Sequence, residues 1–171
     1  TGGDFSAIQV FELPTFEQIG EWQHNMTPMN QQIRILQGIN KHIHDTIIEQ
    51  DSQASPQIFY SMENNTIGEA ALMRVMDIGE ENIEGMFLSE PIRKGHRRKF
   101  RRGFNTTAKF KIDACTKFKE LVEGGKMKIN SQLLISELKD FVATGLSYKA
   151  KPGQHDDLVM SCLLMTRMMK V

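Results

Sequence analysis

The sequence predicts an α/β fold in which a mixed central β-sheet is flanked by helices on both faces. Along the chain, segments that alternate apolar and polar residues, as strands do, are interleaved with segments whose apolar residues recur every three or four positions, as in helices. Interleaved strands and helices are typical of a mixed sheet covered on both sides. The 171 residues are enough for one such domain with its own core and too few for two large ones.

The first third of the chain predicts a hairpin followed by a long helix. Residues 5–13 alternate like a strand, and residues 19–24 are typical of its antiparallel partner. Thr27 and Pro28 predict a helix start, with a capping hydroxyl followed by proline at the first helical position. A row of isoleucines every four residues then predicts an amphipathic helix packed on a sheet. These isoleucines are Ile35, Ile39, Ile43 and Ile47.

The middle third predicts two short strands separated by a helix. Residues 57–62 are apolar and predict a buried strand that ends at Glu63. Residues 66–69 fit a capping box, so we expect a helix that begins there and continues to about Met76. Residues 86–90 predict another strand. The basic stretch that follows has no apolar period and predicts a loop.

The last third predicts three helices. Residues 107–123 form the first, with the glycine pair 124–125 as its stop. Ser131 can cap the second. The apolar residues of this second helix are Leu134, Leu138, Phe141 and Val142. After a turn at residues 151–153, a final helix with almost continuous apolar residues starts near His155.

The charge of the chain is balanced overall but unevenly distributed. It has 21 Lys and Arg against 21 Asp and Glu, yet seven basic residues crowd residues 93–102. These are Arg93, Lys94, Arg97, Arg98, Lys99, Arg101 and Arg102. A run this dense favours salt-sensitive, sequence-independent contact with DNA phosphates, although a charge run is also the usual composition of a solvated loop. Lys109 and Lys111 extend the same predicted surface.

Several classes of protein are excluded by what the sequence lacks. No apolar run approaches the roughly 20 residues of a membrane span, and no signal-peptide pattern opens the chain. Cys115 and Cys162 therefore predict buried thiols in a reducing compartment rather than a disulfide. The sequence has neither the Cys/His spacing of a zinc site nor a G-x-x-x-x-G-K-[ST] phosphate loop, so no ATPase is expected within it.

Acidic residues at three places in the chain predict a metal site. Glu63 stands at the carboxyl end of an apolar strand, where open α/β sheets place their sites. Asp156 and Asp157 begin the apolar final helix, and Asp4 lies in a glycine turn. Carboxylates that converge from such places suit Mg²⁺ or Mn²⁺. Two such ions about 3.5–4 Å apart can promote phosphodiester hydrolysis.

Each of these residues also has a purely structural interpretation. Asp157 can complement the dipole of the final helix, and Glu63 can cap the helix that follows it. Asp4 can be an ordinary turn residue. His155 can act as a proton shuttle or a metal neighbour, or can simply bond to the backbone at a helix start.

Three motifs together resemble the nuclease domain of bacteriophage large terminases, the DNA-packaging motor proteins. Residues 155–161, HDDLVMS, resemble the last motif of that family and are the most specific of the three. Residues 63–65 with Gly68 resemble its middle acidic motif, and residues 1–7 resemble the segment just after its first catalytic aspartate. Because order and separation also match, we expect a single terminase-type nuclease domain over residues 1–171.

The resemblance implies an RNase H-like fold and an endonuclease that cuts concatemeric double-stranded viral DNA by a two-metal mechanism during genome packaging. It implies two Mg²⁺ or Mn²⁺ ions, with Glu63, Asp156 and the auxiliary Asp4 as ligands. Asp157 and His155 are further candidate catalytic residues. Asp156 is preferred to Asp157 because related nucleases place the ligand directly before the pair that corresponds to Asp157 and Leu158. The first catalytic aspartate of the family is expected upstream of Thr1, on a strand truncated in this sequence.

The implied partners are double-stranded DNA, the ATPase domain of the motor, the portal and procapsid, and the small terminase subunit. The implied location is the cytoplasm of the infected host, docked on the procapsid, with no membrane contact. Two other functions stay open. One is a catalytically weak DNA-binding or motor-docking module of the same fold, which the missing first aspartate favours. The other is a junction resolvase of the same fold.

Overall fold

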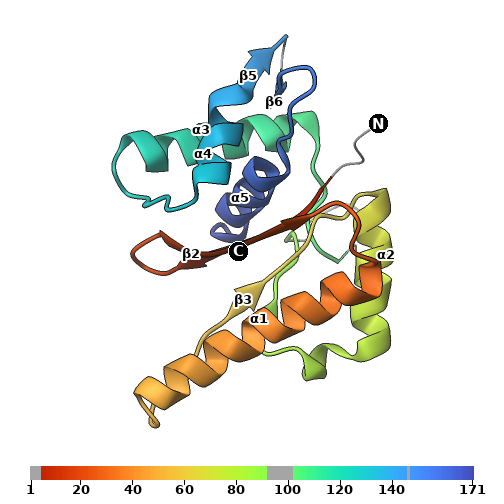
Figure 1. Cartoon of the computed structure of the whole chain (residues 1–171), viewed down its shortest axis with the longest axis vertical. Coiled ribbons are helices and arrows are strands. Elements are labelled where there is room, and N and C mark those ends of the chain that lie inside the picture. Colours follow the sequence, from red (N-terminus) through yellow and green to blue (C-terminus); the bar gives the residue numbers. More distant parts are fainter. Residues whose placement is uncertain (1–4, 92–101, 146) are drawn as a thin grey trace. The chain divides into compact units, whose positions relative to one another are not determined.

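The structure is a computed structural model that describes residues 5–91, 102–145 and 147–171 (Figure 1). The chain divides into two compact units, each with its own apolar core. Unit 1 comprises Thr1–Met26 and Thr106–Lys170, and unit 2 comprises Thr27–Asn105 with Val171. The predicted mixture of helices and strands is confirmed. No helix in the described part of the chain has the length and apolar character of a membrane-spanning segment.

The described residues form three two-stranded sheets instead of the single mixed central sheet that the sequence predicts. Two of the three are antiparallel hairpins made of strands that are neighbours in the sequence. The third is a parallel pair only two residues long. Local pairing therefore accounts for most of the strand hydrogen bonding among the described residues.

The hairpin at the start of unit 1 is the one that the sequence predicts. Strand β1 (Ser6–Glu12) pairs antiparallel with strand β2 (Glu17–His24), and the register shifts between Val10 and Phe11. Gln18 of β2 is buried. Its side-chain amide donates to Gln9 and Glu21, and its side-chain oxygen accepts hydrogen bonds from the backbone N–H groups of Asn130 and Ser131. This polar network fixes the hairpin to the remainder of unit 1.

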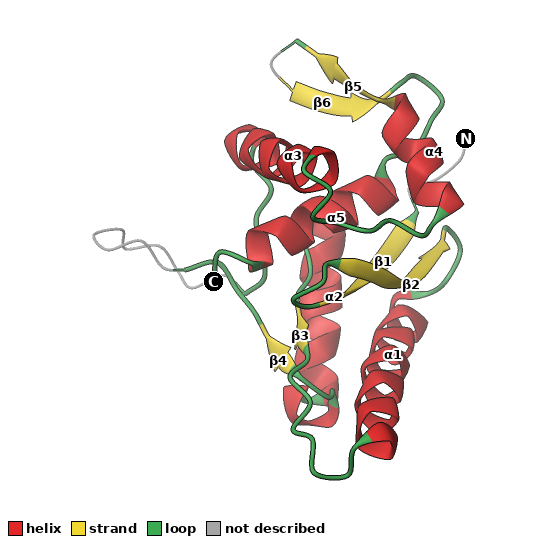
Figure 2. Cartoon of the chain, turned by 90° about the vertical axis from the view of Figure 1, so that its left-hand side faces the viewer, coloured by secondary structure: helices red, strands yellow, loops and turns green. Residues whose placement is uncertain are grey.

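Three helices pack around the core of unit 1: α3 (Ala108–Glu123), α4 (Gln132–Asp140) and α5 (Asp157–Met168). Helix α5 contacts α3, α4 and β1, and Figure 2 shows it in the middle of these elements. A helix that is covered on several sides needs apolar residues around most of its circumference. This explains the nearly continuous apolar sequence of α5, whose Leu158, Val159 and Cys162 are fully buried.

The helix starts predicted at Thr107 and Ser131 are confirmed, and both residues are N-caps, of which only Ser131 was predicted as one. The Thr107 hydroxyl accepts a hydrogen bond from the Phe110 N–H, and the Ser131 hydroxyl accepts one from the Leu134 N–H. Helix α3 ends at Glu123, with Gly124 as its C-cap. These signals succeed because donor and acceptor lie only three residues apart.

The predicted end of the second of these helices is wrong. Helix α4 stops at Asp140, and Phe141 and Val142 belong instead to strand β5 (Phe141–Thr144), which pairs with strand β6 (Ser147–Ala150). The rings of Phe141 and Tyr148 stack with centroids 6.1 Å apart. Aromatic and β-branched residues favour such cross-strand pairs, so the hairpin competes successfully with helix continuation.

Unit 2 consists of two helices side by side, a short parallel strand pair and a 3-10 turn (Figure 1). Its elements are helix α1 (Met29–Gln50), strand β3 (Phe59–Tyr60), helix α2 (Thr66–Ile78), the 3-10 helix η1 (Glu80–Asn82) and strand β4 (Met86–Phe87). The core of the unit is formed by Ile33, Tyr60, Val75 and Ile83.

Three predictions about these helices need correction. Pro28 is the N-cap of α1 rather than its first helical residue. The N-cap of α2 is Asn65, whose side chain accepts a hydrogen bond from the Gly68 N–H at 2.7 Å, so Thr66 does not fill the capping position. The predicted isoleucine row of α1 is only half-buried. The buried residues of this helix are Ile33 and Asn40.

Both cysteines are free thiols, as predicted. Cys162 is buried and Cys115 is half-buried, and burial raises the pKa of each thiol. A raised pKa lowers the thiolate fraction, and the thiolate is the form that reacts. We therefore expect Cys162 to resist iodoacetamide at pH 8 in the folded chain and to react after denaturation in urea, as followed by mass spectrometry. Rapid labelling of Cys162 without denaturant would contradict this packing of α5.

Candidate functional site

The first turn of α5 presents two consecutive carboxylates. Asp156 is the N-cap residue of the helix, yet it makes no side-chain capping hydrogen bond. Its Oδ2 instead accepts a hydrogen bond from the Ala150 N–H at 3.2 Å and lies 3.8 Å from the Lys111 Nζ. The Asp156 side chain keeps 26% of its surface exposed. The Asp156 side chain therefore does not cap α5.

Asp157 and His155 pack against the residue at which the described chain begins. The Asp157 Oδ2 accepts a hydrogen bond from the Phe5 N–H at 3.3 Å and lies 3.8 Å from the His155 Nδ1. The rings of Phe5 and His155 meet edge to face, with centroids 4.7 Å apart. The structure thus brings the HDDLVMS turn to the start of the hairpin, two places that the motifs predict to be functional. Asp4, which precedes Phe5, lies outside the described residues.

Glu137 of α4 is a residue of this region that sequence reasoning missed. Its Oε2 accepts hydrogen bonds from the Leu158 and Val159 N–H groups at 2.9 and 3.1 Å, and its Oε1 accepts one from the Gln23 Nε2 at 3.0 Å. Burial raises the pKa of this carboxyl, and the hydrogen bonds oppose that effect. The available signal was its position three residues after Leu134, inside the apolar stripe of α4.

A small pocket of about 170 Å³ opens beside this turn. Its lining includes Phe5, Gln23, Glu137, Asp140 and His155. This volume is below that of typical small-molecule sites, about 300–1,000 Å³, and suits a few water molecules or a hydrated ion. Because His155 lines the pocket and keeps 41% of its side chain exposed, this side of the turn is reached by solvent.

Glu63 is held in unit 2 by an arrangement of its own. Its backbone forms an isolated parallel bridge with Phe104, and the adjacent Asn64 N–H donates to the Phe104 carbonyl at 2.7 Å. The Glu63 Oε2 accepts a hydrogen bond from the Asn65 Nδ2 at 3.0 Å, while the Asn65 Oδ1 caps α2. Asn65, not Glu63, is therefore the helix cap, and it also orients the Glu63 carboxylate.

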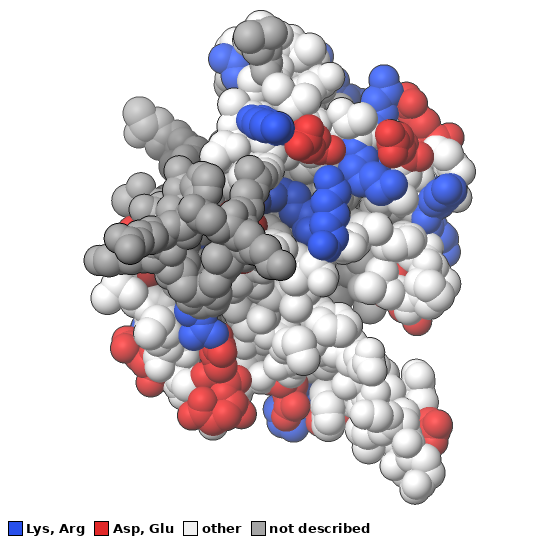
Figure 3. Space-filling view, turned by 180° about the vertical axis from the view of Figure 1, so that it is seen from behind, with Lys and Arg blue, Asp and Glu red and all other residues white. Residues whose placement is uncertain are grey.

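The basic residues predicted to contact DNA fall mostly outside the described residues. These are Arg93, Lys94, Arg97, Arg98, Lys99 and Arg101. Arg102 is described: its guanidinium pairs with Glu80 and lies 5.2 Å from the centre of the Phe87 ring, so packing within unit 2 accounts for it. Lys109 is exposed on the first turn of α3. Figure 3 shows Lys and Arg side chains on the face seen there, with Asp and Glu side chains among them.

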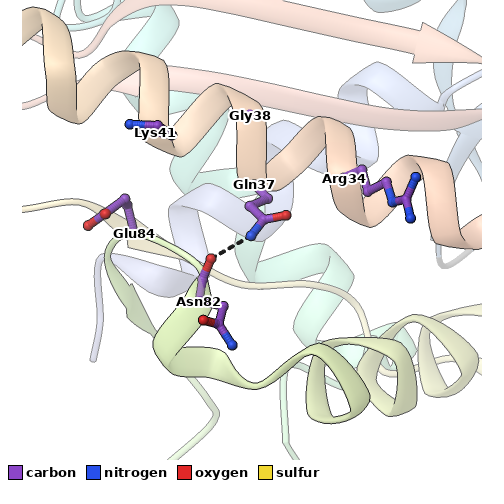
Figure 4. Close-up of a pocket in the computed structure, with 6 residues that line it drawn as sticks. All are labelled: Arg34, Gln37, Gly38, Lys41, Asn82 and Glu84. Carbon is purple, nitrogen blue, oxygen red and sulfur yellow. Dashed lines mark hydrogen bonds between the residues drawn. The ribbon is translucent and has the colours of Figure 1, made fainter.

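A second pocket, of about 230 Å³, lies in unit 2 between α1 and the segment around η1 (Figure 4). Gln37 donates across it to the Asn82 carbonyl at 2.6 Å. Its charged lining residues are of both signs, Arg34, Lys41 and Glu84, and Lys41 is paired with Asp45. None of the candidate catalytic residues lines this pocket, so it is separate from the predicted site.

The donor groups around the α5 turn fit a hard divalent cation in kind. Asp156 and Asp157 offer carboxylate oxygens, the ligands that Mg²⁺ and Mn²⁺ prefer, and both side chains are partly exposed. Among the described residues, no group of three or more His, Cys, Asp or Glu side chains is close enough to hold a metal ion. Two of the predicted ligands, Asp4 and Glu63, lie respectively outside the described residues and in unit 2.

No family model matches the sequence. The structure is nevertheless similar to solved structures of the large terminase nuclease from thermophilic phage G20c. The cobalt-bound form gives a TM-score of 0.62 at 19% identity, covering 97% of this chain and 76% of that one. The magnesium-bound form gives the same TM-score and identity, covering 97% and 75%, and a third structure covers 96% and 75%.

The chain has the fold of a large terminase nuclease. This likeness confirms the resemblance that the three motifs indicate. It extends over nearly all of the chain, far beyond the motifs.

Proposed function

We propose that the chain is a divalent-metal-dependent endonuclease that hydrolyses double-stranded DNA. The observation that carries the proposal is the likeness in fold, over 97% of the chain, to a phage large terminase nuclease solved with magnesium and with cobalt. The carboxylates of the α5 turn supply the matching chemistry, since they are hard oxygen donors with partial access to solvent.

Glu63, Asp156 and Asp4 are the proposed metal ligands. They would hold one or two Mg²⁺ or Mn²⁺ ions, which would supply Lewis-acid chemistry for the attacking water and the leaving oxygen. The residues around the ligands orient them: Asn65 holds the Glu63 carboxylate, and the Ala150 N–H holds Asp156. Hydrogen bonds of this kind reduce the rotamer freedom that ion binding would otherwise have to remove.

His155 and Asp157 are proposed to act together beside the ligands. The His155 ring is held edge-on by Phe5, and its Nδ1 faces the Asp157 carboxylate at 3.8 Å. Lys109 and the basic stretch at residues 93–102 are proposed to contact DNA phosphates, which would make binding sensitive to salt.

The wider role proposed here follows from the resemblance. Residues 1–171 would form one RNase H-like nuclease domain that cuts concatemeric viral DNA during packaging in the cytoplasm of the infected host. Its partners would be the ATPase domain of the motor, the portal of the procapsid and the small terminase subunit. The fold likeness to a phage terminase nuclease supports this context.

The proposal is tested by incubating the purified chain with supercoiled plasmid in Mg²⁺, in Mn²⁺ and in EDTA. We expect open-circular and linear products with either ion and none with EDTA. Salt-dependent DNA binding without cleavage in any metal would instead identify a DNA-binding module. Strong preference for a four-way junction over linear duplex of the same length would identify a junction resolvase.

A further inference from the structure

We infer that Glu137 is a positioning residue for the catalytic turn at Asp156 and Asp157. Its carboxylate ties the first turn of α5 to α4 and β2, and so fixes the direction in which the two aspartates are presented. The inference rests on the proposed function, because it concerns how the same site is held. Glu137 itself has no proposed contact with metal or DNA.

The hydrogen bonds of Glu137 reach across three elements that are distant in sequence. One oxygen, Oε2, accepts from both Leu158 and Val159 at the start of α5, and the other, Oε1, accepts from Gln23 of β2. All three distances lie between 2.9 and 3.1 Å, which is ordinary for strong N–H···O bonds. The Glu137 side chain is half-buried where it makes these bonds.

A helix start needs such acceptors, because its first N–H groups have no partner within the helix. Usually the side chain of the N-cap residue supplies one. In α5 the N-cap residue is Asp156, and its side chain makes no capping bond. Glu137 takes over that function from another helix, which leaves the Asp156 carboxylate free to turn toward Ala150 and Lys111.

Glu137 acts together with other groups that anchor the turn, the Asp157 carboxylate among them. The Asp157 carboxylate fastens the turn to the Phe5 N–H, while Glu137 fastens the two following residues. A carboxylate near the amino end of a helix is additionally favoured by the helix dipole. Without Glu137 the first turn of α5 can fray, and both aspartates would then move with it.

The test compares variants that separate the length of the side chain from its charge. Glu137→Gln keeps the length and one acceptor oxygen but loses the charge. Its NH2 group would face Gln23, whose amide can flip so that its oxygen accepts the hydrogen bond. Glu137→Asp keeps the charge but is too short to reach both N–H groups. The matched control is Ser131→Ala, which removes the cap of α4 and a hydrogen bond to Glu21 and so lowers stability, but keeps the Glu137 side chain.

Mn²⁺ affinity, measured by isothermal titration calorimetry on the full chain, is the first readout. We expect Glu137→Asp and Glu137→Ala to weaken Mn²⁺ binding about 10- to 100-fold, the range typical of outer-shell partners of metal ligands. Glu137→Gln should recover most of the parent affinity, and Ser131→Ala should keep it while lowering Tm. Amide hydrogen exchange at Leu158 and Val159 should speed up only in the two weak variants.

Each outcome decides a different claim. If the parent binds Mn²⁺ and Glu137→Asp binds it equally well, the inference is wrong and the proposed function stands. If Glu137→Gln is as weak as Glu137→Asp, a side chain of the right length with an acceptor oxygen does not suffice to hold the turn, and the inference is again wrong. A parent chain that binds no Mn²⁺ would overturn the proposed function, and with it this role for Glu137.

Discussion

Replacing Asp156 by asparagine is expected to lower the rate of metal-dependent DNA cleavage by at least about a hundredfold. The asparagine oxygen can still accept the hydrogen bond from Ala150, so the start of α5 should be preserved. The lost group is a charged oxygen donor for the metal, and removing a direct ligand should exceed the effects of about 10- to 100-fold seen for outer-shell partners. The measurement is the initial rate of plasmid nicking in Mg²⁺ and Mn²⁺.

Asp113→Asn is the matched control for this change. Asp113 is an exposed aspartate of α3, so the same change of charge occurs in unit 1 away from the turn. We expect it to cut at the parent rate. Parent-like cleavage by Asp156→Asn would refute its role as a ligand. If Asp157→Asn were inactive at the same time, the ligand role would pass to Asp157.

Replacing Gly68 by alanine is expected to destabilise unit 2 and to impair cleavage as well. A Cβ at this position would overlap the carbonyl oxygen of Glu63, which belongs to the backbone and cannot rotate away. Overpacking of this kind usually costs about 1–3 kcal/mol. Since the Gly68 N–H also bonds to Asn65, which in turn holds the Glu63 carboxylate, any shift is passed to the proposed ligand.

The comparison for Gly68→Ala is Gly38→Ala, the same chemical change inside α1. A Cβ at Gly38 would meet nothing within 4 Å. Alanine favours a helix interior over glycine by roughly 0.5–1 kcal/mol, so this variant should be slightly more stable than the parent. Urea denaturation followed by circular dichroism measures both. Equal midpoints for the two variants would mean that the close approach of α2 to Glu63 is not present in solution.

The residues of the candidate site could be predicted where a carboxylate stands next to an apolar segment of the sequence. Two adjacent aspartates at the start of an apolar helix, and a glutamate at the end of an apolar segment, were visible in the sequence. Glu137 was not, because a lone glutamate in an amphipathic helix has many ordinary explanations. Its role depends on backbone N–H groups more than 20 residues away, and no sequence pattern encodes that distance.

By itself, the sequence determined the features that depend on residues close together along the chain. Alternation predicted the β1–β2 hairpin, and Thr107 and Ser131 marked helix starts, since each of these signals acts within a few residues. Only the tertiary structure decided where α4 ends and how the start of α5 is held. Those outcomes depend on hairpin pairing and burial, in which segments distant along the chain compete for the same backbone groups.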